Sequence, residues 1–141
     1  MATHGIIARV TGDGFIGSYH HRDSYPSGLG REIWRTLQGR FGRDPEAFLR
    51  FAIDEHPQGW KSLPDEALRN DGLTEGLTDR MVDWPSVEWA YAIDPNAGTM
   101  AVLKSEIDPA TGRYRPHVMA TVALGGPEPD WAALDREGGI E

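Results

Sequence analysis

The chain has 141 residues, a formal net charge of −8 at pH 7 and no cysteine. This length fits one domain, residues 1–141, with a hydrophobic core of its own. The missing cysteine excludes disulfides, thiolate zinc sites and cysteine nucleophiles. The negative charge argues against general binding to nucleic acids or anionic membranes, because phosphate groups repel such a surface.

The first residues lack the basic start and the apolar run of a signal peptide. No apolar stretch approaches the roughly 20 residues that cross a bilayer. We therefore expect a soluble cytoplasmic protein without a membrane partner.

Residues 4–11 and 15–21 predict two strands of a hairpin, joined by a Gly-Asp-Gly turn. A two-residue loop at positions 13 and 14 would gather His4, His21 and Asp23 at one end of this hairpin. A three-residue loop would shift the pairing by one residue and separate them, because side chains alternate between faces.

Helical spacing of apolar residues predicts a helix over about residues 30–40. Asp44 followed by Pro45 is a strong start signal for a second helix, which should run to about residue 55. A short helix is expected near residues 64–70, followed by a surface loop over residues 71–85.

From residue 87 the pattern changes to the two-residue period of strands. Residues 87–93, 99–107 and 114–124 predict a three-stranded meander, with Gly98 and Gly112 at positive φ in its turns. The tail, residues 125–141, should be loosely packed and hold at most a short helix around residues 130–136.

Strands, then helices, then strands indicate an α+β domain. The simplest assembly is a single antiparallel sheet in which the N-terminal hairpin lies beside the C-terminal meander. Two or three helices would cover one face of this sheet.

The stretch from Tyr19 to Arg31 concentrates histidines, charges, phenols and glycines as no other part of the chain does. Backbone N–H groups at a glycine-rich helix start favour an anion, and Arg22 and Arg31 flank that start. Together with His4, this stretch supplies the candidate ligand-binding residues. They are His4, Tyr19, His20, His21, Arg22, Asp23, Tyr25, Gly28, Gly30 and Arg31. The alternative is a plain strand-to-helix connection.

A second hypothesis is acid–base catalysis on water by His21, polarised by Asp23 two residues away. The same pair could equally be a structural hydrogen bond. Neighbouring histidines on a strand point to opposite faces, so we predict no metal site and no cofactor.

The start Met1-Ala2-Thr3 and the segment Tyr19-His20-His21-Arg22-Asp23-Ser24-Tyr25-Pro26, followed by Gly30, resemble a family of small uncharacterised proteins of actinobacteria and bacteriophages. That family carries an aromatic-x-x-x-Asp-Gly/Ser-Tyr-Pro-x-x-x-Gly motif. The resemblance covers about the first fifth of the chain and implies a phage or mobile-element setting, but no chemistry.

The leading hypothesis is therefore an accessory protein that sequesters a small anionic ligand, such as a nucleotide, without turnover. The alternatives are a small hydrolase that uses His21 and Asp23, and a protein–protein interaction module. A protein partner or a homo-oligomer fits each of them.

Overall fold

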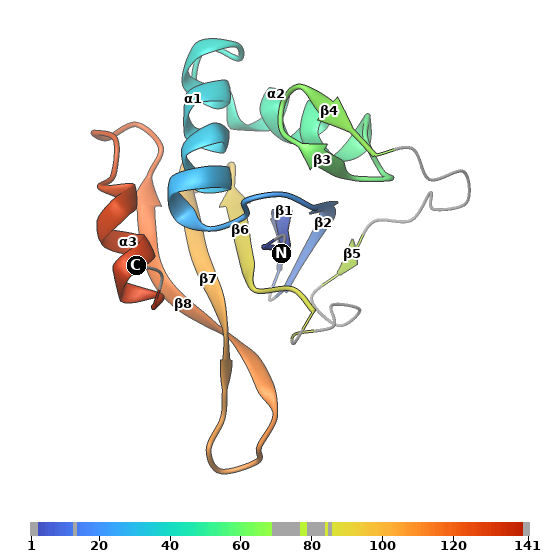
Figure 1. Ribbon diagram of the computed structural model, residues 1–141. Coiled ribbons are helices and arrows are strands. Elements are labelled where there is room, and N and C mark those ends of the chain that lie inside the picture. Colours follow the sequence, from blue (N-terminus) through green and yellow to red (C-terminus); the bar gives the residue numbers. More distant parts are fainter. Residues whose placement is uncertain (1–2, 13, 69–76, 79–83, 85, 140–141) are drawn as a thin grey trace.

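The computed structural model describes residues 3–12, 14–68, 77–78, 84 and 86–139. These residues form an eight-stranded sheet of order β4-β3-β2-β1-β6-β7-β8, with β5 paired to β2 (Figure 1). The strands are β1 (Gly5–Thr11), β2 (Gly14–His20), β3 (Trp60–Ser62), β4 (Glu66–Ala67), β5 (Leu77–Thr78), β6 (Trp89–Asp94), β7 (Thr99–Ile107) and β8 (Tyr114–Ala123).

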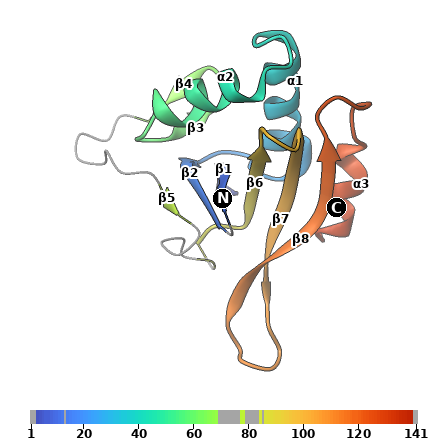
Figure 2. The same cartoon turned by 180° about the vertical axis from the view of Figure 1, so that it is seen from behind.

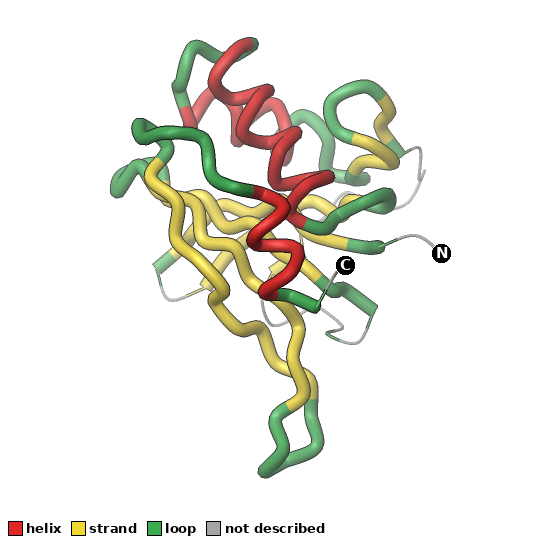
Figure 3. The backbone as a smooth tube through the Cα atoms, turned by 60° about the vertical axis from the view of Figure 1, so that its left-hand side comes forward, coloured by secondary structure: helices red, strands yellow, loops and turns green. Residues whose placement is uncertain are grey.

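The helical elements lie on one face of this sheet (Figure 3). They are η1 (Pro26–Gly30), α1 (Arg31–Gly39), α2 (Pro45–Leu49), η2 (Arg50–Asp54) and α3 (Trp131–Glu137), where η denotes a π-helical turn. From behind, the strands lie in front of α1 and α3 (Figure 2). We call the two sides of the sheet the helix face and the open face.

The expected single antiparallel sheet is wrong, because the sheet is mixed. β1 pairs with β6 in parallel, with Gly5 opposite Trp89, and β2 pairs with β3 in parallel. The helical segment starts and finishes at the same end of the sheet, because Trp60 of β3 pairs with His20 at the end of β2. β6 also starts at this end, with Trp89 opposite Gly5, and therefore runs in the same direction as β1. Alternating burial is the same in either direction, and the sequence pattern could not distinguish them.

The predicted N-terminal hairpin is confirmed, but its register differs from the expected one by two residues. Thr11 pairs with Gly14 and Gly5 with His20, so the loop residues are positions 12 and 13 rather than 13 and 14. A shift by an even number keeps every side chain on its expected face, and it places His4 opposite His21.

The two predicted helices are confirmed over residues 31–39 and 45–54, the second as α2 continued by η2. The Asp44 side chain accepts hydrogen bonds from the N–H groups of Glu46 and Ala47, as expected of an N-cap. The short helix expected near residues 64–70 is wrong, because Glu66–Ala67 is strand β4, paired with β3. Most of the loop expected over residues 71–85 lies outside the described residues.

The predicted meander is confirmed as β6, β7 and β8 in consecutive antiparallel pairs. Gly98 and Gly112 have φ of 68° and 71°, as predicted for its turns. The far half of β7 and β8 extends away from the rest of the molecule as an arm (Figure 1). The register of the pair shifts between Val102 and Leu103, where β8 carries one extra residue.

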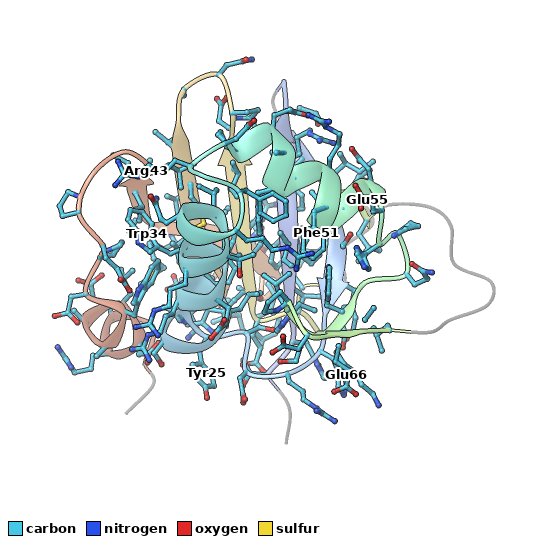
Figure 4. The ribbon with its side chains drawn as sticks, turned by 90° about the horizontal axis from the view of Figure 1, so that it is seen from above. Tyr25, Trp34, Arg43, Phe51, Glu55 and Glu66 are labelled. Atoms are coloured by element: carbon cyan, nitrogen blue, oxygen red, sulfur yellow. The ribbon has the colours of Figure 1, made fainter. Side chains whose placement is uncertain are left out.

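The main core lies between the sheet and the helices. α3 contributes Trp131, whose ring meets that of Trp34 edge to face at 6.3 Å, and Figure 4 shows Trp34 on the side of α1 toward α3. Leu134 of α3 is buried in the same core. A smaller core on the open face contains Ile6, Phe15 and Trp84 together with several alanines.

Candidate functional site

The stretch from Tyr19 to Arg31 is divided between the two faces of the sheet. Side chains alternate along β2, so His20 points to the helix face while Tyr19 and His21 point to the open face. The candidate residues therefore form separate groups rather than one site.

His20 is a buried structural residue with 2% of its surface exposed. Its Nδ1 lies 2.9 Å from the Ser24 hydroxyl, and its Nε2 accepts the N–H of Leu63 at 3.0 Å. Burial, with a smaller contribution from the charge of His21, lowers the pKa of His20 to about 4. The imidazole is therefore neutral near pH 7 and holds the end of β2 against the chain at Leu63.

Ser24 joins three separate parts of the chain at the end of this segment. Its N–H donates to the carbonyl of Thr3 at 3.0 Å, and its carbonyl accepts the Tyr91 hydroxyl at 2.6 Å. Burial, followed by the charge of Asp135, raises the pKa of Tyr91 well above its ordinary value. The phenol is thus a permanent donor, and this group is structural.

Asp23 organises the turn through its backbone. Its φ of 51° is in the left-handed region, and its carbonyl accepts the N–H of Leu29 at 2.9 Å. A Cβ at Gly28 would overlap that carbonyl oxygen, which explains the glycine there. The pKa of Tyr25 is raised by burial, and then by the charge and hydrogen bond of the Asp23 carboxylate. The carboxylate therefore faces Tyr25, and the expected bond from Asp23 to His21 or His4 is not formed.

The N–H groups at the helix start already have partners inside the protein. Ser27 donates to an Asp135 carboxylate oxygen of α3 at 2.9 Å, Gly28 donates to the Tyr25 carbonyl, and Leu29 donates to Asp23. The position where the sequence predicted a bound anion is therefore occupied by the carboxylate of Asp135. Sequence reasoning missed Asp135, which is 108 residues from Ser27 and gives no local signal.

A cavity of about 180 Å³ lies beside the same turn. Its lining includes His20, Arg22, Asp23, Glu32 and Asp65. The guanidinium of Arg22 is 3.4 Å from a Glu66 carboxylate oxygen, so its charge is partly neutralised. Three carboxylates against one paired cation make this cavity a poor place for an anion.

His4, Tyr19 and His21 form a half-buried ring cluster on the open face. The two imidazoles stack with centroids 4.8 Å apart and an interplanar angle of 27°. The Tyr19 hydroxyl lies 2.8 Å from Nδ1 of His4 and 3.0 Å from Nδ1 of His21. Nδ1 of His4 also lies 3.0 Å from the His21 carbonyl. Burial raises the pKa of Tyr19, which therefore stays protonated.

These contacts assign the protons of the ring cluster. A carbonyl only accepts, so the Nδ1–H of His4 donates to the His21 carbonyl and faces the Tyr19 oxygen. The hydroxyl proton of Tyr19 is then free to donate to Nδ1 of His21, and we assign it there. Neutral His4 then has a lone pair on Nε2, whereas neutral His21 has an N–H there. Within the described part of the chain, neither Nε2 atom has a protein partner, and neither is among the buried unpaired atoms; both residues are half-buried.

The remaining candidates at the helix start belong to the packing of α1. Gly30 is buried, with Tyr91 and Trp131 beside it, and Nε of Arg31 is buried without a partner in the described structure. Residues 3–12, 14–68, 77–78, 84 and 86–139 contain no group of three or more histidine, aspartate or glutamate side chains that could hold a metal ion.

Comparison of the chain with protein-family models, curated proteins and solved structures finds no match. The proposed function therefore depends on the geometry of the site. Among the described helices, none is both long and apolar enough to span a membrane.

Proposed function

We propose that the protein binds a small anion, such as the phosphate of a nucleotide, at the ring cluster of His4, Tyr19 and His21, without turnover. The observation that carries this proposal is the pair of Nε2 atoms that have no partner among the described residues and whose rings are fixed through Nδ1. Fixed rings lose little conformational freedom on binding, which favours affinity.

The ring cluster can present one or two N–H donors to an anion, depending on the protons that it carries. With both rings neutral, the pair offers one acceptor on His4 and one donor on His21. A proton on Nε2 of His4 converts this into two N–H donors and a positive charge, which suits a phosphate or carboxylate oxygen.

Glu88 is the nearest acidic residue in the same row of the sheet. Its N–H donates to the His4 carbonyl at 3.0 Å, which places Glu88 beside His4 just before β6. Its side chain is exposed and lies on the open face, because it alternates with that of Trp89. A carboxylate there opposes an anion. It provides a charge control that leaves both imidazoles in place.

The test is NMR titration of the wild-type protein with inorganic phosphate and with AMP. We expect the imidazole signals of His4 and His21 to shift on addition of the anion, and His21→Gln to weaken binding about tenfold. His117→Gln, at an exposed histidine on the arm, should bind as wild type does, and Glu88→Gln should bind more tightly. Equal affinity of His21→Gln and wild type would contradict the proposal.

A second candidate function is acid–base hydrolysis at the same cluster. The specific observation in its favour is the opposite protonation of the two Nε2 atoms, which places a base on His4 beside an acid on His21. The partner of His21 is Tyr19, not the Asp23 expected from the sequence. Hydrolysis of a phosphodiester or ester probe that is lost in both His4→Gln and His21→Gln would favour the hydrolase over a binding protein.

The proposed biological setting depends only on the resemblance of the N-terminal start and of residues 19–30 to proteins of actinobacteria and bacteriophages. In a bacterial cytoplasm with a phage or mobile element, a binding protein without turnover would act by sequestering a nucleotide-like signal. Native mass spectrometry of the protein purified from its host tests this, because a retained small molecule would be detected directly.

A further inference from the structure

We infer that the open face of β7 and β8 is the contact surface of a homodimer. This inference is independent of the proposed ligand site. In the described part of the chain, the exposed large apolar side chains are Ile107, Tyr114 and Val118, with 57%, 47% and 53% of their surface exposed. All three belong to the arm.

Strand register places these side chains on the same face. Ile107 pairs with Tyr114, and Leu103 pairs with Val118, so all four side chains project to the open face. The opposite face of the arm carries the charged or titratable pairs Glu106–Arg115 and Lys104–His117. The two faces of this arm therefore differ sharply in polarity.

The open face of the two strands carries no charged residue. It consists of Thr99, Ala101, Leu103, Ser105, Ile107, Tyr114, Pro116, Val118, Thr121 and Ala123. Ala101 and Leu103 are half-buried against the smaller core, and Ser105 donates to the Trp84 carbonyl. The exposed part is Ile107, Tyr114, Pro116, Val118, Thr121 and Ala123. Thr121 and Ala123 lie on this face although they are an odd number of residues from Val118. The extra residue in β8 after Val118 shifts the alternation of side chains by one position. Depletion of charge is typical of interface cores, whereas charged residues make up 26% of this chain.

The missing charge favours a second copy of the chain as the partner. A two-fold contact brings a patch against itself, so any charge near the axis would meet its own counterpart. Each copy carries a net charge of −8, so an uncharged face meets its equivalent with less repulsion than most of the surface would.

The size of the face fits a weak dimer. Ten residues of β8 at about 3.4 Å each make it about 34 Å long, and two strands make it about 10 Å wide. Each face then covers about 340 Å², so two of them would bury about 700 Å² in total, which is below the size of stable specific interfaces and is expected of a weak, transient contact.

Contact through the face is favoured over strand pairing at the free edge of β8. The N–H of Ser105 donates to Glu88 of the β6 side, so Pro116, opposite Ser105, turns its own backbone groups to the outer edge. Proline has no N–H, which interrupts the donors there and protects the edge from strand addition.

The test is sedimentation velocity over a range of protein concentrations, with Val118→Lys and His117→Lys as matched variants. Both add a positive charge at neighbouring exposed positions, but only the first does so on the open face. We expect a concentration-dependent dimer for wild type and His117→Lys, and a dissociation constant raised at least about tenfold for Val118→Lys.

Circular dichroism checks that each variant is folded, and Ile107→Lys serves as a second variant on the same face. A wild-type protein that stays monomeric up to about 1 mM would overturn the inference. So would a dimer that Val118→Lys and Ile107→Lys leave intact, or one that His117→Lys dissociates equally.

Discussion

On the helix face, His20 has both ring nitrogens bonded inside the protein, whereas on the open face the next residue, His21, keeps Nε2 free. The two residues have the same chemistry and differ only in the direction in which the strand turns them. Burial makes His20 a neutral structural residue, and partial exposure leaves His21 available for a ligand. The two adjacent histidines therefore have separate roles, one in the structure and one in the candidate binding site.

The largest expected effect is on stability, and it separates these two histidines. His20→Ala should lower the free energy of unfolding by about 3 kcal/mol or more, because it leaves the Leu63 N–H unpaired and a cavity beside Ser24. His21→Ala should lower it by less than about 1 kcal/mol, since its ring is half-exposed. Urea denaturation of both variants measures this difference, and equal losses would break the comparison.

The second effect concerns pH. The pKa of His20 is lowered to about 4 from an ordinary value of 6.5, so the unfolded chain binds a proton that the folded protein excludes between these values. Its contribution to stability is therefore fully present above pH 6.5 and is lost as the pH falls toward 4, by roughly 3 kcal/mol. The free energy of unfolding measured across this range should fall less steeply for His20→Gln than for wild type. Parallel curves would refute this assignment.

A smaller effect is expected at the hydroxyl that supports the same turn. Tyr91→Phe removes the donor to the buried Ser24 carbonyl and should destabilise the protein by about 1–2 kcal/mol, without altering phosphate binding at the ring cluster. Thermal melting and the phosphate titration together measure both parts. A variant with wild-type stability would show that Tyr91 acts only through packing.

The smallest effect is expected at the helix start. Asp135→Ala removes the acceptor of the Ser27 N–H and should lower stability by about 1 kcal/mol. Because the ring cluster lies on the other face, its affinity for phosphate should stay unchanged. Weaker phosphate binding in His21→Gln, together with unaltered binding in Asp135→Ala, would locate the anion at the ring cluster. The opposite result would locate it at the helix start.

Much of the fold follows from local signals in the sequence. The period of two from residue 87, the Asp44-Pro45 start and the glycine turns are short-range patterns, and the strands and helices they predict are present. The direction of β6 beside β1 is a long-range property, and so is the β4 strand where a helix was expected. Alternation of apolar residues contains no information on either.

The candidate site was predicted only in part, because local patterns give the face on which a side chain lies but not its partner. Alternation along β2 separates His20 from His21 and groups His21 with Tyr19, and the hairpin adds His4. The partner of the imidazoles is the Tyr19 phenol rather than Asp23, because the chain turns out of the strand at Asp23 with φ of 51°. Backbone conformation at a single residue decided which side chains meet.

The parallel pairing of β1 with β6 also has a consequence for biosynthesis. β1 is a central strand, yet its second neighbour begins at Trp89, after more than half of the chain has been made. On the ribosome, the N-terminal hairpin therefore emerges with both edges uncovered, and the β1 edge stays unpaired until β6 has been made, as expected for folds with many non-local contacts. Protease protection of β1 in nascent chains should consequently appear only after β6 has left the exit tunnel. Protection at shorter lengths would show that the hairpin is stable alone.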